Sequence, residues 1–172
     1  RSELNWYSRH QLNARWSTAV LAHGNIMLME NDINRDGFLD LPLGSQLNLH
    51  NRWKYDDGKG ITAQLGWVAI SDERRGGQLG FNHNRPQAEQ TEYGTQMQVN
   101  RAEVYGKLGY VFPEERYKSV GYMSRGSQQR MQAFFGNNDY SGFERSWYNN
   151  LIYQGIHGNS SRKFRAGLSF MA

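Results

Sequence analysis

The stretch Gln46-Leu47-Asn48-Leu49-His50-Asn51-Arg52-Trp53-Lys54-Tyr55 has the clearest pattern in the chain. One alternate set of positions is wholly polar, and the other carries Leu47, Leu49, Asn51, Trp53 and Tyr55. Successive side chains of a β-strand point to opposite faces, so this alternation predicts a strand with one apolar and one polar face. The turn sequence Asp56-Asp57-Gly58-Lys59-Gly60 follows directly and predicts a tight reversal of the chain.

The same alternation predicts strands along the rest of the chain. One strand runs from Ile61 to about Ala69, and another covers about 102–112, where Pro113 ends it because proline cannot donate to a ladder. Less regular alternation predicts strands at about 117–134 and 143–157. Segments 4–9, 16–28 and 163–170 bring the total to about eight antiparallel strands, so the predicted fold class is all-β.

The connections between these strands alternate in length. Short turns are expected at about 10–14, 56–60, 113–116 and 158–161, and longer loops at about 29–42, 73–95 and 135–141. Outer-membrane barrels combine long antiparallel strands, short periplasmic turns, longer extracellular loops and aromatic girdles at both membrane interfaces. We therefore predict that residues 1–172 form one segment of an antiparallel transmembrane β-barrel, with the longer loops extracellular and the short turns periplasmic.

A soluble β-sandwich is the alternative, because its strands also alternate. Sandwich strands are usually about 5–6 residues long, and their apolar faces pack a shared core. Strands of about a dozen residues whose second face carries Arg, Lys, His and Gln fit a wet lumen better.

The net charge of +4 comes from basic residues scattered singly along strands, which disfavours nucleic acid as a partner. With no Cys, the chain has neither disulfides nor a thiolate metal site.

The segment Asp32-Ile33-Asn34-Arg35-Asp36-Gly37-Phe38-Leu39-Asp40 has the spacing of a calcium loop. In such loops, side-chain oxygens at positions 1, 3 and 5 and a backbone carbonyl at position 7 bind one ion, and glycine at position 6 permits the turn. The predicted calcium ligands are therefore Asp32, Asn34 and Asp36 by side chain, Phe38 by its carbonyl, and Asp40 directly or through water.

The usual last ligand of this pattern is missing. Position 12, where a bidentate Glu is expected, is Leu43, and strands rather than helices flank the loop. The sequence thus predicts a weaker site, or one completed by Glu30 or by a neighbouring loop. In the alternative interpretation, the segment is a polar turn whose Asp and Asn side chains bind their own backbone.

Five segments, in their order and spacing, resemble the barrel of TonB-dependent outer-membrane receptors, with the closest likeness to their cobalamin (vitamin B12) branch. They are Trp16-Ser17-Thr18, the loop 32–42, Asn51-Arg52-Trp53-Lys54-Tyr55, Asp72-Glu73-Arg74-Arg75-Gly76-Gly77-Gln78 and Phe164-Arg165-Ala166-Gly167-Leu168-Ser169-Phe170. The resemblance implies a plugged barrel of about 22 strands. We expect this chain to be a middle section of such a barrel, without the plug; a complete eight-stranded barrel is the alternative.

The resemblance also implies a function: active uptake of a scarce nutrient across the outer membrane, with cobalamin favoured over a siderophore or a glycan. Calcium would order the extracellular loops that bind the nutrient. The implied partners are membrane lipids, TonB acting through the absent plug, the small-molecule nutrient and a surface lipoprotein lid. A small barrel that acts as a passive pore or structural protein is the rival function.

Candidate substrate-binding residues lie in the expected loop 73–95: Arg74, Arg75, Phe81 and Tyr93. The alternative is a loop that keeps its charges in water.

No pattern predicts an enzyme. The histidines lack the i, i+2 or i, i+4 pairing of zinc ligands, and Ser160-Ser161 has no nucleophile elbow or identifiable base. A barrel enzyme would need a Ser/His or Asp/His site at the rim.

Overall fold

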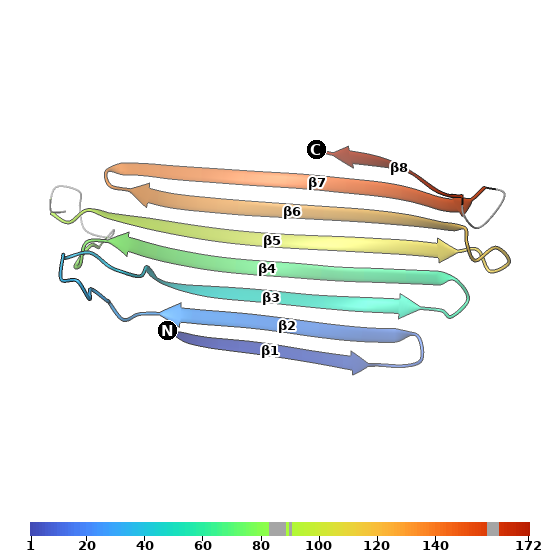
Figure 1. Ribbon diagram of the computed structural model, residues 1–172, viewed down its shortest axis with the longest axis horizontal. Coiled ribbons are helices and arrows are strands. Elements are labelled where there is room, and N and C mark those ends of the chain that lie inside the picture. Colours follow the sequence, from blue (N-terminus) through green and yellow to red (C-terminus); the bar gives the residue numbers. More distant parts are fainter. Residues whose placement is uncertain (83–88, 90, 158–161) are drawn as a thin grey trace.

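The computed structural model of the protein describes residues 1–82, 89, 91–157 and 162–172. Eight strands follow one another along the chain (Figure 1). They are β1 (Ser2–Gln11), β2 (Trp16–Met27), β3 (Leu43–Asp56), β4 (Ile61–Gly77), β5 (Gly94–Val111), β6 (Ser119–Phe135), β7 (Asn138–Ile156) and β8 (Lys163–Met171). The all-β, antiparallel fold class predicted from alternation is confirmed.

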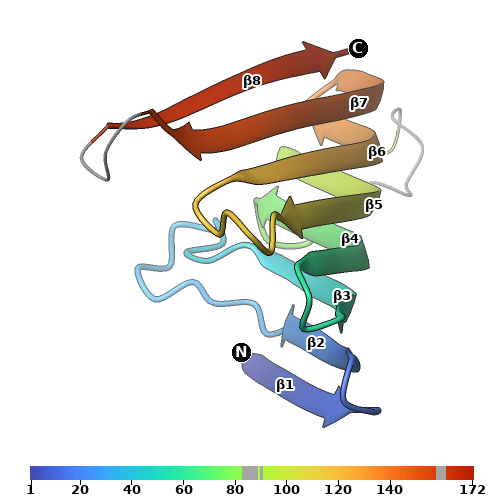
Figure 2. The same ribbon diagram turned by 90° about the vertical axis from the view of Figure 1, so that its right-hand side faces the viewer.

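Each strand pairs only with its neighbours in sequence, in the order β1-β2-β3-β4-β5-β6-β7-β8. β1 and β8 therefore form the two edges of an open sheet. Figure 2 shows this sheet twisted and curved along its width. No helix in the described part of the chain has the length and apolarity needed to cross a membrane.

Several strands run further than the alternation of apolar residues predicts. β4 continues to Gly77 and β5 starts at Gly94, so both enter the expected loop 73–95. The register continues there through polar pairs such as Arg75 opposite Gln96. These pairs carry no apolar period, although their backbones still complete the ladder.

The connection expected at about 135–141 is only two residues long, Gly136 and Asn137. Gly136 has φ 62°, and glycine at the first central position is typical of a two-residue hairpin turn. The other expected connections lie close to their predicted places, between β1 and β2, β2 and β3, β3 and β4, and β5 and β6. The turn expected at 158–161 lies outside the described residues.

One face of the sheet, here called the apolar face, carries the large apolar side chains. In β4 and β5 its residues run from Ile61 to Ala69 and, paired with them, from Tyr110 to Ala102. All five tryptophans stand on this face, spread over five strands: Trp6, Trp16, Trp53, Trp67 and Trp147. Each is more than a third exposed.

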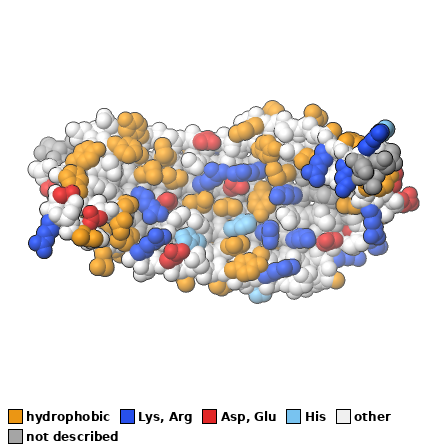
Figure 3. Space-filling view, in the orientation of Figure 1, with side chains coloured by type: hydrophobic (Ala, Val, Ile, Leu, Met, Phe, Trp, Pro, Cys, Tyr) orange, Lys and Arg blue, Asp and Glu red, His pale blue; other side chains and the backbone are white. Residues whose placement is uncertain are grey.

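The opposite face, here called the polar face, is more crowded and more charged. In β4, every polar-face residue from Gln64 to Arg74 is buried or half-buried, whereas Leu65 and Trp67 on the apolar face are exposed. Figure 3 shows Lys and Arg side chains across the middle of this face, with His and acidic side chains among them. The sheet is thus apolar on its open face and polar on its crowded face, the reverse of a soluble sheet.

The described residues contain only a small apolar core. Ala19, Leu43, Phe81 and Ala133 are its buried hydrophobic residues, and no large side chain among the described residues is fully buried. Two of the four, Leu43 and Phe81, lie where the long connections meet the sheet. Apolar burial within the described chain therefore fixes the end of the sheet where the long connections lie, rather than its middle.

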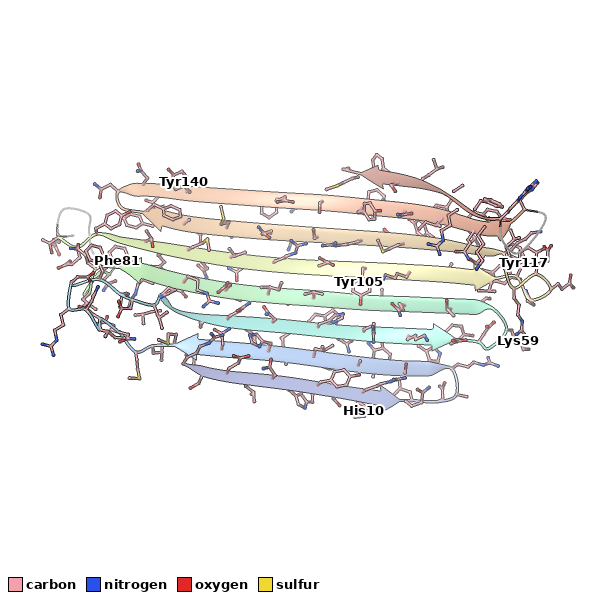
Figure 4. All side chains as sticks on the ribbon, in the orientation of Figure 1. His10, Lys59, Phe81, Tyr105, Tyr117 and Tyr140 are labelled. Atoms are coloured by element: carbon pink, nitrogen blue, oxygen red, sulfur yellow. The ribbon has the colours of Figure 1, made fainter. Side chains whose placement is uncertain are left out.

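Local hydrogen bonds fix the short turns at the opposite end of the strands, where Figure 4 labels Lys59 and Tyr117. The carboxylate of Asp57 accepts hydrogen bonds from the amides of Lys59 (2.7 Å) and Ile61 (2.9 Å), which lower the pKa of Asp57. Between β5 and β6, Lys118 Nζ (2.5 Å) and Tyr117 Oη (2.8 Å) donate to Glu115, and they hold its pKa below the ordinary value. These polar turns are specified by adjacent residues.

Candidate functional site

The predicted calcium loop lies in the connection between β2 and β3. Asp32 begins it, and its two carboxylate oxygens accept hydrogen bonds from the amides of Asp36 (3.1 Å) and Gly37 (3.0 Å). Arg35 (φ 59°) and Gly37 (φ 83°) adopt left-handed backbone conformations, which turn the chain around this carboxylate. The glycine predicted from the spacing therefore does make the sharp turn.

The other predicted ligands lie around the same small loop. Asn34 Nδ2 donates to one oxygen of Asp36 (2.9 Å), and the other oxygen of Asp36 accepts from the amide of Phe38 (2.8 Å). The carboxylate of Asp40 instead accepts from the amide of Ile33 (2.6 Å). The structure brings Asp32, Asn34 and Asp36 together and turns Asp40 toward the start of the loop.

The donor set of this loop suits a hard cation in part. Carboxylate oxygens hold two lone pairs each, so an oxygen that accepts one amide hydrogen bond can still bind an ion. Calcium prefers such oxygens, together with carbonyl oxygens like that of Phe38. However, among the described residues no three His, Cys, Asp or Glu side chains are grouped as a metal site requires.

Leu43 occupies position 12 of the loop, where a calcium loop usually has a carboxylate, and it has a structural role instead. Leu43 is the first residue of β3, is only 5% exposed and pairs with Arg75. A carboxylate at this position would be buried where β3 begins, and burying an unpaired charge is unfavourable. The loop is held from the other side: Leu39 N donates to Gly77 O and Leu79 N to Gly37 O, each at 2.9 Å. Any completing ligand would come from this neighbouring segment or from Glu30.

The four candidate substrate residues do not converge. Arg74 and Arg75 are adjacent in β4, so their side chains lie on opposite faces of the sheet. Arg74 lies on the polar face, where it donates to Asp72 (2.8 Å) and to Gln46 (3.1 Å). Arg75 lies on the apolar face, level with Leu43 and Gln96.

Phe81 and Tyr93 hold the described ends of the β4–β5 connection against the sheet. Phe81, labelled in Figure 4, is 4% exposed. Its ring covers Gly94, leaving no room for a Cβ atom there, and it stacks on Phe134 with centroids 5.8 Å apart. Tyr93 packs beside Gly136 in the β6–β7 turn, and more than half of its surface is exposed. The packing role of Phe81 is one that sequence reasoning did not predict.

The polar face holds a charged cluster that sequence reasoning missed. Glu103 accepts hydrogen bonds from Arg101 (3.1 Å) and Arg125 (2.7 Å), and its side chain is only 13% exposed. Next to it in β5, the hydroxyl of Tyr105 is hydrogen-bonded to His50 in β3 (2.9 Å). The strand register brings these residues together, and none forms a recognisable motif along the chain.

Comparison with protein-family models, curated proteins and solved structures found no match. The candidate site therefore rests on three observations from the chain itself. The first is the loop 32–40, whose oxygens are arranged around a left-handed turn. The second is its attachment to the β4–β5 connection. The third is the opposed polarity of the two faces of the sheet.

Proposed function

We propose that the chain forms part of the wall of a β-barrel in the bacterial outer membrane. The apolar face carries this proposal, because it exposes large hydrophobic residues from β1 to β8, including Trp6, Leu65, Val104, Trp147 and Leu168. Such a face is unfavourable in water and favourable against lipid tails. In this orientation the polar face lines the lumen.

The height of the apolar band supports the same proposal. On β5 the band runs from Ala102 to Tyr110, opposite Ala69 to Ile61 on β4. Eight residue steps span about 27 Å along a strand, or about 21 Å across the membrane at a tilt of about 40°. The apolar band of outer-membrane barrels is about 25 Å high.

The open sheet favours a section of a large barrel over a closed eight-stranded pore. A closed barrel pairs its first strand with its last, whereas β1 and β8 are the two edges of this sheet. Together with the resemblance in sequence, this supports a TonB-dependent receptor that imports a scarce nutrient, with cobalamin as the favoured ligand. Binding of cobalamin to the protein in vesicles, compared with ferric siderophores and glycans, tests the choice of ligand.

Native tryptophan fluorescence tests the orientation of the sheet. All five tryptophans of the chain lie on the apolar face, so lipids brominated on their acyl chains are expected to quench their emission strongly. Acrylamide in the aqueous phase is expected to quench weakly. Strong quenching by acrylamide, with no effect of the brominated lipids, would refute the proposed membrane wall.

Within this proposal, calcium bound by Asp32, Asn34, Asp36 and the carbonyl of Phe38 orders the extracellular mouth. Because Leu39 is hydrogen-bonded to Gly77 at the end of β4 and Gly37 to Leu79 just beyond it, an ion in this loop steadies the start of the β4–β5 connection as well. The ion supplies a positive centre that offsets the repulsion among the carboxylates. The residues themselves contribute the turn and the oxygen ligands.

Calcium is expected to slow hydrogen exchange at the amides of Asp36 and Gly37, which the Asp32 carboxylate already holds. The change Asp36→Ala should abolish this calcium effect, because it removes a charged ligand from the centre of the loop. Asp57→Ala is the matched control, since Asp57 accepts hydrogen bonds in the β3–β4 turn, at the opposite end of the strands. Equal exchange with and without millimolar calcium would remove the proposed site.

A further inference from the structure

The apolar face contains a groove that runs along β5 and β6. One row across the sheet consists of Trp67 in β4, Val104 in β5, Gly126 in β6 and Trp147 in β7. The two indoles stand on either side, and the floor between them is one valine and one glycine. The spacing of strands, about 4.8 Å, separates the backbones of β4 and β7 by about 14 Å.

Two adjoining hollows make up this groove. One, of about 750 Å³, is lined by both tryptophans, Val104, Gly126 and Arg145. The other, of about 640 Å³, is lined by Arg130, Phe143 and Arg145 among others. The hollows share Ala69, Ala102, Gln128 and Arg145 in their walls, so they form one continuous groove. It is apolar between the tryptophans and basic at its other end.

The basic end contains two exposed arginines, Arg130 and Arg145, at one margin of the apolar band. Neither Arg130 nor Arg145 forms an ion pair within the described part of the chain. The guanidinium of Arg145 lies 4.9 Å from the ring centroid of Phe143, which orients it at the groove. Charged side chains on a lipid-facing surface are costly at the middle of the bilayer and nearly neutral at its interface. Their place at one margin of the band therefore corresponds to the headgroup level.

We propose that this groove binds a phosphate-bearing membrane lipid. One acyl chain lies over Val104 and Gly126 between Trp67 and Trp147, and the phosphate is bound by Arg130 and Arg145. Guanidinium groups match phosphate with two parallel hydrogen bonds, and an apolar groove that ends in two such groups complements a tail joined to an anionic head. This inference rests on the proposed membrane wall and adds a specific lipid site to it.

The test measures lipid retained by the protein after transfer from vesicles into neutral detergent. The vesicles contain phosphatidylcholine with phosphatidylglycerol, and native mass spectrometry counts the bound phosphatidylglycerol. Arg130→Gln combined with Arg145→Gln is expected to lower retention about tenfold or more, because charge-assisted hydrogen bonds to the phosphate are lost. Arg75→Gln, on the same face outside the groove, should leave retention unchanged.

A second variant blocks the tail without touching the charges. A Cβ atom at Gly126 would meet no atom within 4 Å, so Gly126→Leu fills the groove and leaves the sheet intact. Gly142→Leu is the matched control, because Gly142 has the same open surroundings but lies on the polar face. Gly126→Leu is expected to lower lipid retention, and Gly142→Leu is not.

Three outcomes would overturn the lipid site. They are unchanged retention in both groove variants, loss of retention in the controls to the same extent, and release of the lipid by inorganic phosphate with no effect of Gly126→Leu. The last result would indicate a site for a free anion. Quenching by brominated lipids is recorded on the same samples, so intact quenching with no specific retention rejects this site and leaves the membrane wall standing.

Discussion

Replacing Leu151 by arginine is expected to destabilise the protein in a membrane by about 2 kcal/mol, because Leu151 lies in the row of Leu108, inside the apolar band, and a basic residue on a barrel surface costs about 2–4 kcal/mol at the bilayer midplane and less toward the interfaces. Leu151 lies on the apolar face, flanked by Tyr122 and Leu168. The loss corresponds to a drop of roughly 30-fold in the ratio of folded to unfolded protein, at about 1.4 kcal/mol for each factor of ten. Reversible urea unfolding in vesicles measures it.

The neighbouring residue provides the control. Ile152 is 43% exposed, against 44% for Leu151, but it lies on the polar face between Gly121 and Gly167. Ile152→Arg therefore makes the same kind of change on the face that we assign to the lumen, and water there should keep its cost within about 1 kcal/mol. Equal costs for the two substitutions would contradict the assignment of the faces.

The second large effect is expected at Phe81. Truncation of a buried phenylalanine to alanine typically costs about 3–5 kcal/mol, and the ring of Phe81 covers Gly94 and stacks on Phe134. Phe81→Ala should release the β4–β5 connection from the sheet. The amide of Gln78 donates to the carbonyl of Tyr93 and that of Leu79 to the carbonyl of Gly37, and hydrogen exchange at both amides should then become at least tenfold faster.

Ile33→Ala is the control for this effect. Ile33 lies in the connecting loop alongside and is 78% exposed, so its truncation removes an apolar side chain without emptying a packed site. Gly94→Ala should reproduce the Phe81→Ala result from the other side, because the new methyl group displaces the ring. The packing role of Phe81 is wrong if exchange at Gln78 and Leu79 is the same in Phe81→Ala as in the unaltered protein.

Alternation predicts the middle of each strand well and its ends poorly. Leu47 to Tyr55 and Ile61 to Ala69 alternate because one face is apolar, and the structure pairs these runs as predicted. Beyond Asp72, both faces of β4 are polar, so the sequence resembles a loop while the backbone continues its ladder to Gly77. The two-residue turn at Gly136 escaped prediction for a similar reason, because the polar run Asn137-Asn138-Asp139 resembles a longer loop although Asn138 and Asp139 already belong to β7.

The candidate sites also differ in how well the sequence predicts them, depending on whether their residues are local in the chain. The calcium spacing at Asp32, Asn34 and Asp36 is local, so the sequence alone identifies it, and the structure places these side chains around one turn. The sequence predicts Arg74 and Arg75 as substrate contacts because both fall in the expected loop 73–95. Adjacency in a strand places them on opposite faces, and they cannot line one surface together.

The sequence by itself determined the all-β class, the polarity of the regularly alternating strands and the calcium spacing, because these depend on residues close together in the chain. The tertiary structure alone decided which strands stand side by side, and hence every feature that spans several strands. It places all five tryptophans on one face, and Arg101 and Arg125 against Glu103. It also places Trp67 opposite Trp147 across a groove that ends at two arginines. The physical reason is register: each antiparallel pairing fixes which residues share a row, and no single strand contains that information.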